Sequence, residues 1–538
     1  MSKILSYRFT LYFSLLILFA VFILNTIPPL NWGYDEFGSI ISHLELDNLA
    51  YKETYRDYLF NIGITNPWTL DFIVGNVMPL IVVPLRWTYA IGISPILGIS
   101  RFIEIDWPIL GFILLIPYII LAVVGAYLVA LSISKNDEYQ NIFLFFISLV
   151  LLSHPFLKWT LTLTSYSHHL FCFGLLLYSE TQFKETNNIF SRVTFSRSVI
   201  QLFNYQYIVI IAIVGLYQLI INFRVFFKDK VYLNWVLPGA IAVISISFLF
   251  FRGLVSGKHI NPAYASNTEI YNFSSNTDTL MSSIQFTINR LIDFLYYFFI
   301  ESKSFYGGPN DTNLSLIAVF ICILFIIGIY FKILKKINKN IKRLLLLLLF
   351  SLLVPYLLSF QPFVATRHSL VLFLPIALVL SFTISIFLEF FIKKKNVMLV
   401  SLLLLLFSAY NAIGFNGNKN VNLNIEKITP ILSQYSINQI ILSPCDFRPL
   451  LYNDIRNFYK IVYRCGPKIV NKVGPYEERI AVLSEKNILV SDAKKIILDF
   501  SEDDWILTED FINCNTKIIN KDLCMSPIYI FDRVIKND

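Results

Sequence analysis

Long apolar segments alternate with short polar loops along this chain as far as residue 413. Apolar runs of about 17 to 25 residues are long enough to cross the hydrocarbon core of a bilayer as helices. Eleven segments fit this pattern and are expected to be transmembrane helices: 9–27, 72–94, 109–131, 142–157, 161–178, 199–221, 232–251, 314–331, 344–360, 370–392 and 397–413. The first follows Lys3 and Arg8, lacks a small-residue cleavage site before Pro28, and is typical of an uncleaved signal anchor.

Basic residues concentrate in alternate loops between these segments. Arg224, Lys228 and Lys230 lie in one loop, and the next basic loops are 335–343 and 393–395. Because Lys and Arg accumulate in cytoplasmic loops, the N-terminus is expected in the cytoplasm and, with an odd number of spans, the C-terminus outside. The expected extracytoplasmic parts are a first loop over 28–71, a second over 252–313, and everything after Gly414.

The pattern changes at residue 415. Apolar runs shrink to strand length at 439–442, 505–507 and 528–531, and charged, helix-like stretches such as 449–462 lie between them. This alternation predicts a small soluble α/β domain over 415–538, outside the membrane.

Four of the six cysteines lie in this C-terminal part: Cys445, Cys465, Cys514 and Cys524. An even number of cysteines in an oxidising compartment favours one or two disulfides, and three full pairings are open. A zinc site is the alternative, but neither a C-x-x-C spacing nor a histidine accompanies these cysteines.

Composition agrees with the span pattern. Of the 538 residues, 56% are hydrophobic and only 15% charged, and the mean hydropathy is +0.62. The fold class expected is therefore an all-α polytopic membrane protein of about eleven transmembrane helices with a small C-terminal α/β domain. The net charge of +8 lies largely in short loops and no nucleic-acid motif is found, so nucleic acid is not an expected partner. The phosphate-binding, dinucleotide-binding and H-E-x-x-H metalloprotease motifs are also missing from the sequence.

Two adjacent carboxylates, Asp35 and Glu36, follow directly after the first apolar segment. A carboxylate at the membrane surface can accept a proton from an incoming hydroxyl, which makes the pair a candidate catalytic site. The neighbouring Trp32, Gly33 and Tyr34 favour a shaped, partly desolvated pocket. The alternative is that the carboxylates only cap a helix lying in the interface.

Arg367 and His368 stand at the outer mouth of the tenth segment. A guanidinium at this depth is costly unless it meets an anion, and lipid phosphates lie at the same depth. Arg367 is thus a candidate phosphate ligand, with His368 as a second donor. An arginine that merely anchors the helix end is the alternative.

The fifth segment contains Tyr166, His168 and His169. Histidines are unusual in an apolar segment, so these three residues are candidates for lining a cavity. Adjacent positions on a helix point about 100° apart, so both histidines cannot face one cavity squarely. Burial in the core with satisfied hydrogen bonds is the competing interpretation.

This layout resembles the C-type (GT-C) integral membrane glycosyltransferases, especially the branch of protein O-mannosyltransferases and aminoarabinose transferases. The resemblance covers residues 1–410: the signal anchor, the Asp35–Glu36 pair, the first loop, the many spans and the arginine before the tenth span. The stretch from Met78 to Ala130 adds a proline-led apolar run, then Ser100 and Arg101, then a long helix.

The resemblance implies a membrane enzyme, with residues 1–414 as its catalytic domain, that passes a sugar from a polyprenyl-phosphate carrier to an acceptor hydroxyl outside. Asp35 would be the general base, Glu36 would orient Asp35 or a neighbouring helix without transferring a proton, and Arg367 would hold the lipid phosphate. The expected partners are the lipid-linked sugar, membrane lipid, and a glycan, lipid or protein acceptor. No metal site is expected; beyond Asp35 and Glu36 no carboxylate cluster is evident, and a divalent cation stays an open alternative.

Two other functions compete with this one. A polymerase or ligase of lipid-linked glycans would share the outside arginines but need no acid after the first span. A transporter or flippase would move its substrate without covalent change. For all three the expected location is the bacterial inner membrane.

Overall fold

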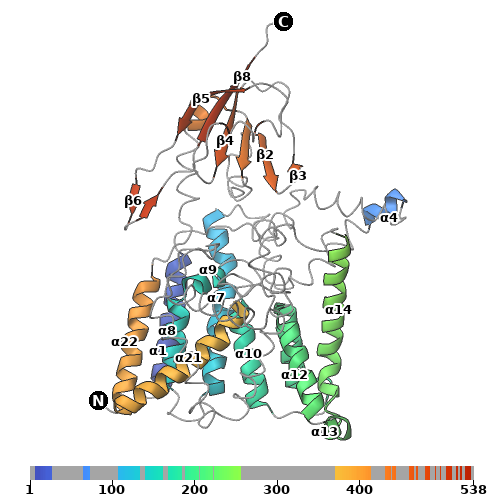
Figure 1. Ribbon diagram of the computed structural model, residues 1–538, viewed down its shortest axis with the longest axis vertical. Coiled ribbons are helices and arrows are strands. Elements are labelled where there is room, and N and C mark those ends of the chain that lie inside the picture. The colour runs from blue at the N-terminus through green and yellow to red at the C-terminus, as the bar shows by residue number, and fades with distance from the viewer. Residues whose placement is uncertain are drawn as a thin grey trace, which may run out of the picture. The chain divides into compact units, whose positions relative to one another are not determined.

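The computed structural model describes part of the chain (Figure 1). The described residues are 7–26, 65–72, 107–133, 140–161, 168–183, 188–204, 206–221, 223–255, 370–413, 431–437, 439–443, 460–465, 468–470, 479–484, 491, 497, 505–511, 516–518, 521–523 and 528–534. Their elements fall into two compact units, one built from helices and the other around a β-sheet. The predicted domain limits, 1–414 and 415–538, remain a prediction, because residues 414–430 lie outside the described parts.

The described residues are mostly helical. The helices are α1 (Tyr7–Thr26), α4 (Pro67–Phe72), α7 (Trp107–Ile133), α8 (Gln140–Leu152), α9 (His154–Thr160), α10 (His169–Gln182), α11 (Arg192–Phe203), α12 (Tyr207–Ile221), α13 (Phe223–Lys228), α14 (Leu233–Val255), α21 (Leu370–Phe391) and α22 (Lys394–Ala412).

Three described helices are long and apolar enough to cross a membrane: Arg8–Asn25 in α1, Leu115–Ile133 in α7, and Leu370–Phe391 in α21. Four shorter apolar stretches accompany them in α8, α12, α14 and α22. These helices are compatible with a membrane protein. The count of eleven spans stays a prediction, because residues 73–94, 314–331 and 344–360 lie outside the described parts of the chain.

The predicted helix over 142–157 is two helices instead of one. α8 ends at Leu152 and α9 begins at His154, with Ser153 between them. The Ser153 Oγ accepts a hydrogen bond from the Phe156 N–H at 3.4 Å, which caps α9. Pro155 fits the first turn of α9 because that position needs no N–H donor. Apolarity alone does not reveal such a break.

The predicted helix over 199–221 is also two helices, α11 and α12, joined by a turn at Asn204. The Asn204 Oδ1 accepts the N–H of Gln206 at 3.0 Å and holds this turn. The start of α11 lies beside Asn234, and the end of α12 beside Trp235, so α11 and α12 run in opposite directions. The helix expected over 161–178 begins at His169 and continues to Gln182.

The centre of the helical unit is α8, which packs against α1, α21 and α22. Residues 140–151 of α8 are all buried. Only residues 392–393 separate α21 from α22, and the two helices diverge from this connection (Figure 1). At the far end of α22, the Asn25 Nδ2 of α1 donates a hydrogen bond of 2.8 Å to the Ala412 carbonyl. The end of α1 is therefore fixed to the end of α22.

Helices α7 and α10 cross at two glycines. A Cβ atom built on Gly174 would overlap the Gly125 carbonyl, and one on Gly125 would overlap the Leu170 carbonyl. Away from the crossing, the Gln182 Nε2 donates to the Leu131 carbonyl at 3.1 Å. Small residues let helix backbones approach this closely, which is a common way of packing helices in membranes.

Gly174→Ala is expected to destabilise the protein by about 1–3 kcal/mol, because the added methyl forces two backbones apart. The matched control is Gly239→Ala in α14, where an added Cβ meets nothing within 4 Å. There the substitution is expected to be neutral or to stabilise the helix by up to about 1 kcal/mol. Unfolding of the purified protein in mixed micelles measures both. Equal effects of the two substitutions would contradict the close crossing.

The second unit contains a six-stranded sheet of order β3-β2-β1-β4-β8-β5. Its strands are β1 (Gln439–Ser443), β2 (Lys460–Cys465), β3 (Lys468–Val470), β4 (Arg479–Ser484), β5 (Trp505–Phe511) and β8 (Ile528–Arg533), and a separate hairpin joins β6 (Thr516–Ile518) to β7 (Lys521–Leu523). β1 pairs in parallel with β2 and β4, whereas β3, β8 and β5 pair antiparallel with their neighbours. The buried cluster on this sheet comprises Ile441, Ile480, Val482, Ile497, Trp505, Tyr529 and Phe531.

The strands predicted at 439–442, 505–507 and 528–531 are confirmed. The helix-like interpretation of 449–462 is wrong at its end, because residues 460–462 begin β2. Residues 461–463 are Ile, Val and Tyr, a β-branched and aromatic run that suits a strand beside β1.

Arg479 and Asp532 face each other across the β4–β8 pair. The Arg479 Nε and Nη2 donate to the two Asp532 carboxylate oxygens at 2.5 and 3.1 Å. These hydrogen bonds lower the pKa of Asp532 below its usual value of 3.8. Both side chains are more than a third exposed, so the pair contributes about 1 kcal/mol or less to the free energy of unfolding.

The stability that this pair contributes should depend on pH. Because the folded-state pKa of Asp532 is lowered, the contribution is present above 3.8 and is lost as the pH falls below that value. The difference in melting temperature between the full-length protein and Asp532→Asn should therefore shrink as the pH falls from 6 to about 3. Asp510→Asn, at an exposed position of β5, is the control. A pH-independent difference for Asp532→Asn would contradict the pair.

Candidate functional site

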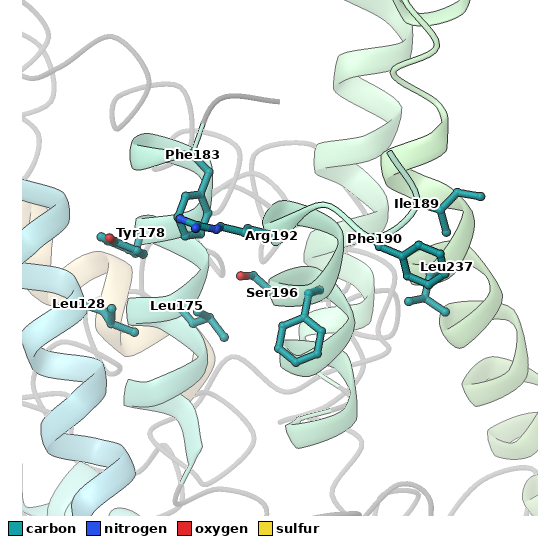
Figure 2. Close-up of a pocket in the computed structure, with 10 residues that line it drawn as sticks. Leu128, Leu175, Tyr178, Phe183, Ile189, Phe190, Arg192, Ser196 and Leu237 are labelled. Atoms are coloured by element: carbon teal, nitrogen blue, oxygen red, sulfur yellow. The ribbon is translucent and has the colours of Figure 1, made fainter. Parts of the chain in front are cut away.

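A pocket of about 400 Å³ opens where α10, α11 and α14 meet, with one residue of α7 in its wall (Figure 2). This volume lies within the usual range for small-molecule sites. The lining residues are Leu128, Leu175, Tyr178, Phe183, Ile189, Phe190, Arg192, Phe195, Ser196 and Leu237. The connection from α10 to α11 and the first turns of α11 form much of the wall.

Arg192 is the one charged residue among these ten lining residues. It is the first residue of α11 and is exposed. Its guanidinium carbon lies 5.7 Å from the centre of the Phe183 ring, within reach of a cation–π contact. Figure 2 shows the Arg192 side chain extending from α11 toward Phe183 and Tyr178. The pocket thus combines an apolar wall with a single positive charge.

Beside the pocket, α10 and α11 are joined by a buried ion pair. The Arg197 Nε and Nη2 donate to the two Glu180 carboxylate oxygens at 2.7 and 3.1 Å. The Arg197 side chain has no exposed surface and that of Glu180 only 11%. Two parallel hydrogen bonds of this kind are the strong form of a salt bridge and fix the relative position of the helices.

Trp235 of α14 covers one face of the Arg197 guanidinium, whose carbon lies 3.7 Å from the ring centre. The Trp235 Nε1 donates to the Gln218 Oε1 of α12 at 3.1 Å. Gly215 leaves the space that the Trp235 ring fills, since a Cβ there would lie 3.0 Å from that ring. Arg197 and Trp235 together therefore connect the four helices α10, α11, α12 and α14.

A hydroxyl network holds the first turn of α11 against the start of α14. The Ser191 Oγ donates to the Asn234 Oδ1 at 2.9 Å and accepts the Thr194 N–H at 3.1 Å. The Thr194 Oγ1 donates to the Asn234 carbonyl at 3.3 Å. Ser191 is a standard N-cap residue. This network positions the adjacent Arg192 at the pocket.

His168 and His169 are buried, with 1% and no exposed surface. The His168 ring packs against Tyr118 at 4.7 Å and Phe203 at 5.3 Å between ring centres. The Asn204 Nδ2 lies 3.3 Å from a ring nitrogen of His169. Neither histidine lines the pocket. Their part in a cavity formed with residues outside the described ranges stays a prediction.

The other predicted site residues lie outside the described parts of the chain: Asp35, Glu36, Tyr166, Arg367 and His368. The predicted disulfides of the C-terminal part lie outside the described side chains as well. Among the described residues, no group of three or more His, Cys, Asp or Glu side chains lies together as a metal site.

Sequence reasoning did not identify the ion pair or the pocket. Glu180 and Arg197 stand just outside the predicted spans 161–178 and 199–221, so each could be taken for an ordinary loop charge. Opposite charges at the facing ends of consecutive apolar segments are the signal that could have suggested the pair.

No protein-family model, no curated protein and no solved structure matches this chain.

Proposed function

We propose that this chain is an integral membrane glycosyltransferase. It transfers a sugar from a polyprenyl-phosphate donor to an acceptor hydroxyl on the extracytoplasmic side. The proposal includes about eleven spans of the C-type arrangement and a soluble α/β domain after residue 414. The C-terminal sheet then lies outside the membrane, on the acceptor side.

One observation carries the proposal. The two helix ends that are nearest in sequence to the predicted catalytic positions, the end of α1 and the start of α21, lie at the same end of the helical unit. Asp35 follows the end of α1 by nine residues, and Arg367 precedes the start of α21 by three. The end of α1 is bonded to the end of α22 through Asn25. α22 follows α21 after only two residues, so the start of α21 and the end of α22 both lie away from their connection (Figure 1).

The proposed chemistry uses a base and a phosphate ligand from these two positions. The acceptor oxygen attacks the anomeric carbon and gives its proton to Asp35, while the bond from that carbon to the phosphate oxygen breaks. The phosphate leaves with the bonding electrons, and Arg367 stabilises its growing charge. Attack opposite the leaving group inverts the anomeric centre. Glu36 orients Asp35.

The test is sugar transfer by the purified full chain in liposomes. The donors are a panel of radiolabelled polyprenyl-phosphate sugars, and the acceptors are extracted envelope glycans, lipids and proteins. Label is expected to move from one donor into a covalent product of inverted configuration. Vesicles without protein are the control. No transfer from any donor, or flux of a lipid-linked sugar without covalent change, would reject the proposal.

A further inference from the structure

We propose that the pocket beside Arg192 binds an anionic membrane phospholipid. An acyl chain lies between α10, α11 and α14, and the phosphate meets the Arg192 guanidinium. None of the ten residues that line this pocket is a proposed catalytic residue, so the lipid proposal stands or falls independently of the glycosyltransferase proposal.

The two arginines of α11 differ in what neutralises their positive charge. The Arg197 charge is neutralised by the two oxygens of Glu180 and covered by Trp235. Arg192, five residues earlier, has the Phe183 ring as its contact and no carboxylate within ion-pair distance among the described residues. The pocket therefore presents a positive charge that an anionic group can neutralise.

The wall around this charge is apolar and partly open. Phe190 and Phe195 are 85% and 66% exposed, and both line the pocket. Leu128, Leu175 and Leu237 complete the apolar surface from three different helices. Burying aromatic surface of this kind against a lipid chain lowers its free energy relative to exposure to water.

The end of the helical unit that holds Arg192 also has the features of a headgroup region. Ser191 is hydrogen-bonded to Asn234 at the start of α14, next to the turn that follows α13. On α13, Phe223 and Phe227 are exposed. Arg224 and Lys228 are exposed on the same short helix. Aromatic and basic residues gather in this way where a helix lies among lipid headgroups.

The positive charge of Arg192 and the apolar wall together determine which class of ligand fits the pocket. A soluble anion would neutralise Arg192 but leave the phenylalanines in contact with water. A wholly apolar ligand would cover the wall but leave the guanidinium without an anion. An anionic phospholipid satisfies both, and a membrane supplies it at this depth.

Photolabelling of the full chain in phosphatidylcholine vesicles tests the site. Phosphatidylglycerol or phosphatidylcholine carrying a diazirine on the acyl chain is added in trace amount, and labelled peptides covering residues 188–196 are quantified by mass spectrometry. The anionic probe is expected to label these residues about five- to tenfold more than the neutral one, since an arginine near an anionic headgroup is worth about that factor.

Four variants make the test specific. Arg192→Gln should reduce labelling by the anionic probe to the level of the neutral probe, and Arg192→Lys should retain most of the preference. Leu237→Trp, which fills the pocket, should reduce labelling by both probes. Arg224→Gln removes an exposed charge that does not line the pocket and should leave the preference unchanged.

Several results would overturn the proposal. Equal labelling by the two probes would show that the headgroup is not recognised. An equal loss in Arg224→Gln and Arg192→Gln would indicate a general surface charge. Competition by millimolar glycerol phosphate would point to a soluble anion in place of a lipid. Absence of label in these residues would show that no lipid chain enters the pocket.

Discussion

Asp35→Asn is expected to lower the rate of sugar transfer by about 10²- to 10⁴-fold, the usual contribution of a general base. Asparagine keeps the shape of the side chain but cannot accept the acceptor proton, so donor binding should change little. The rate is measured with saturating radiolabelled donor in liposomes, and binding of the donor is measured separately. Loss of both rate and binding would instead indicate a disrupted fold.

Three variants serve as comparisons for Asp35→Asn. Glu36→Gln should have a smaller effect, because Glu36 is proposed to orient the base and not to take the proton. Asp229→Asn, an exposed carboxylate in the turn after α13, should leave transfer unchanged. Arg367→Gln should weaken donor binding as well as lower the rate. Transfer at the normal rate by Asp35→Asn would mean that another group is the base.

Arg197→Leu is expected to destabilise the helical unit by about 3–5 kcal/mol, the cost of leaving a buried charge without its partner. Glu180 would keep its carboxylate only 11% exposed, with the guanidinium removed. Unfolding of the purified full chain in mixed micelles measures the change. Arg192→Gln, the exposed arginine of the same helix, is the control and should change stability by about 0.5 kcal/mol or less.

The double variant Glu180→Leu with Arg197→Leu separates charge from packing. Removing both charges should restore much of the stability lost in Arg197→Leu, because no buried charge is left unpaired. A double variant as unstable as Arg197→Leu would show that the contact with Trp235 is the main contribution. Full stability in Arg197→Leu alone would contradict the buried pair.

The fold could be predicted where local pattern and final structure coincide. The strands at 439–442 and 528–531 were predicted because short apolar runs of β-branched and aromatic residues favour a sheet. The long apolar runs predicted α1, α7 and α21 within a few residues. The breaks at Ser153 and Asn204 were missed because a hydropathy window averages over a single capping or turn residue.

The pocket could not be predicted from any one stretch of sequence. Its wall combines Leu128, Leu175, Arg192 and Leu237, which come from four helices and become neighbours only after packing. In the sequence, Arg192 looks like an ordinary loop charge. Only the structure shows that the Glu180 carboxylate bonds to Arg197 and not to Arg192. Asp35 and Arg367, in contrast, were predicted from their local sequence context and from the resemblance to a known family.

The pairing of Glu180 with Arg197 has a consequence for biosynthesis. A charged side chain that is buried without its partner costs about 3–5 kcal/mol. Neither α10 nor α11 carries its own counter-ion, and only residues 183–191 separate them. The two helices should therefore take their final positions only as a pair, because a nascent chain that ends before Arg197 leaves the Glu180 carboxylate of α10 without its partner.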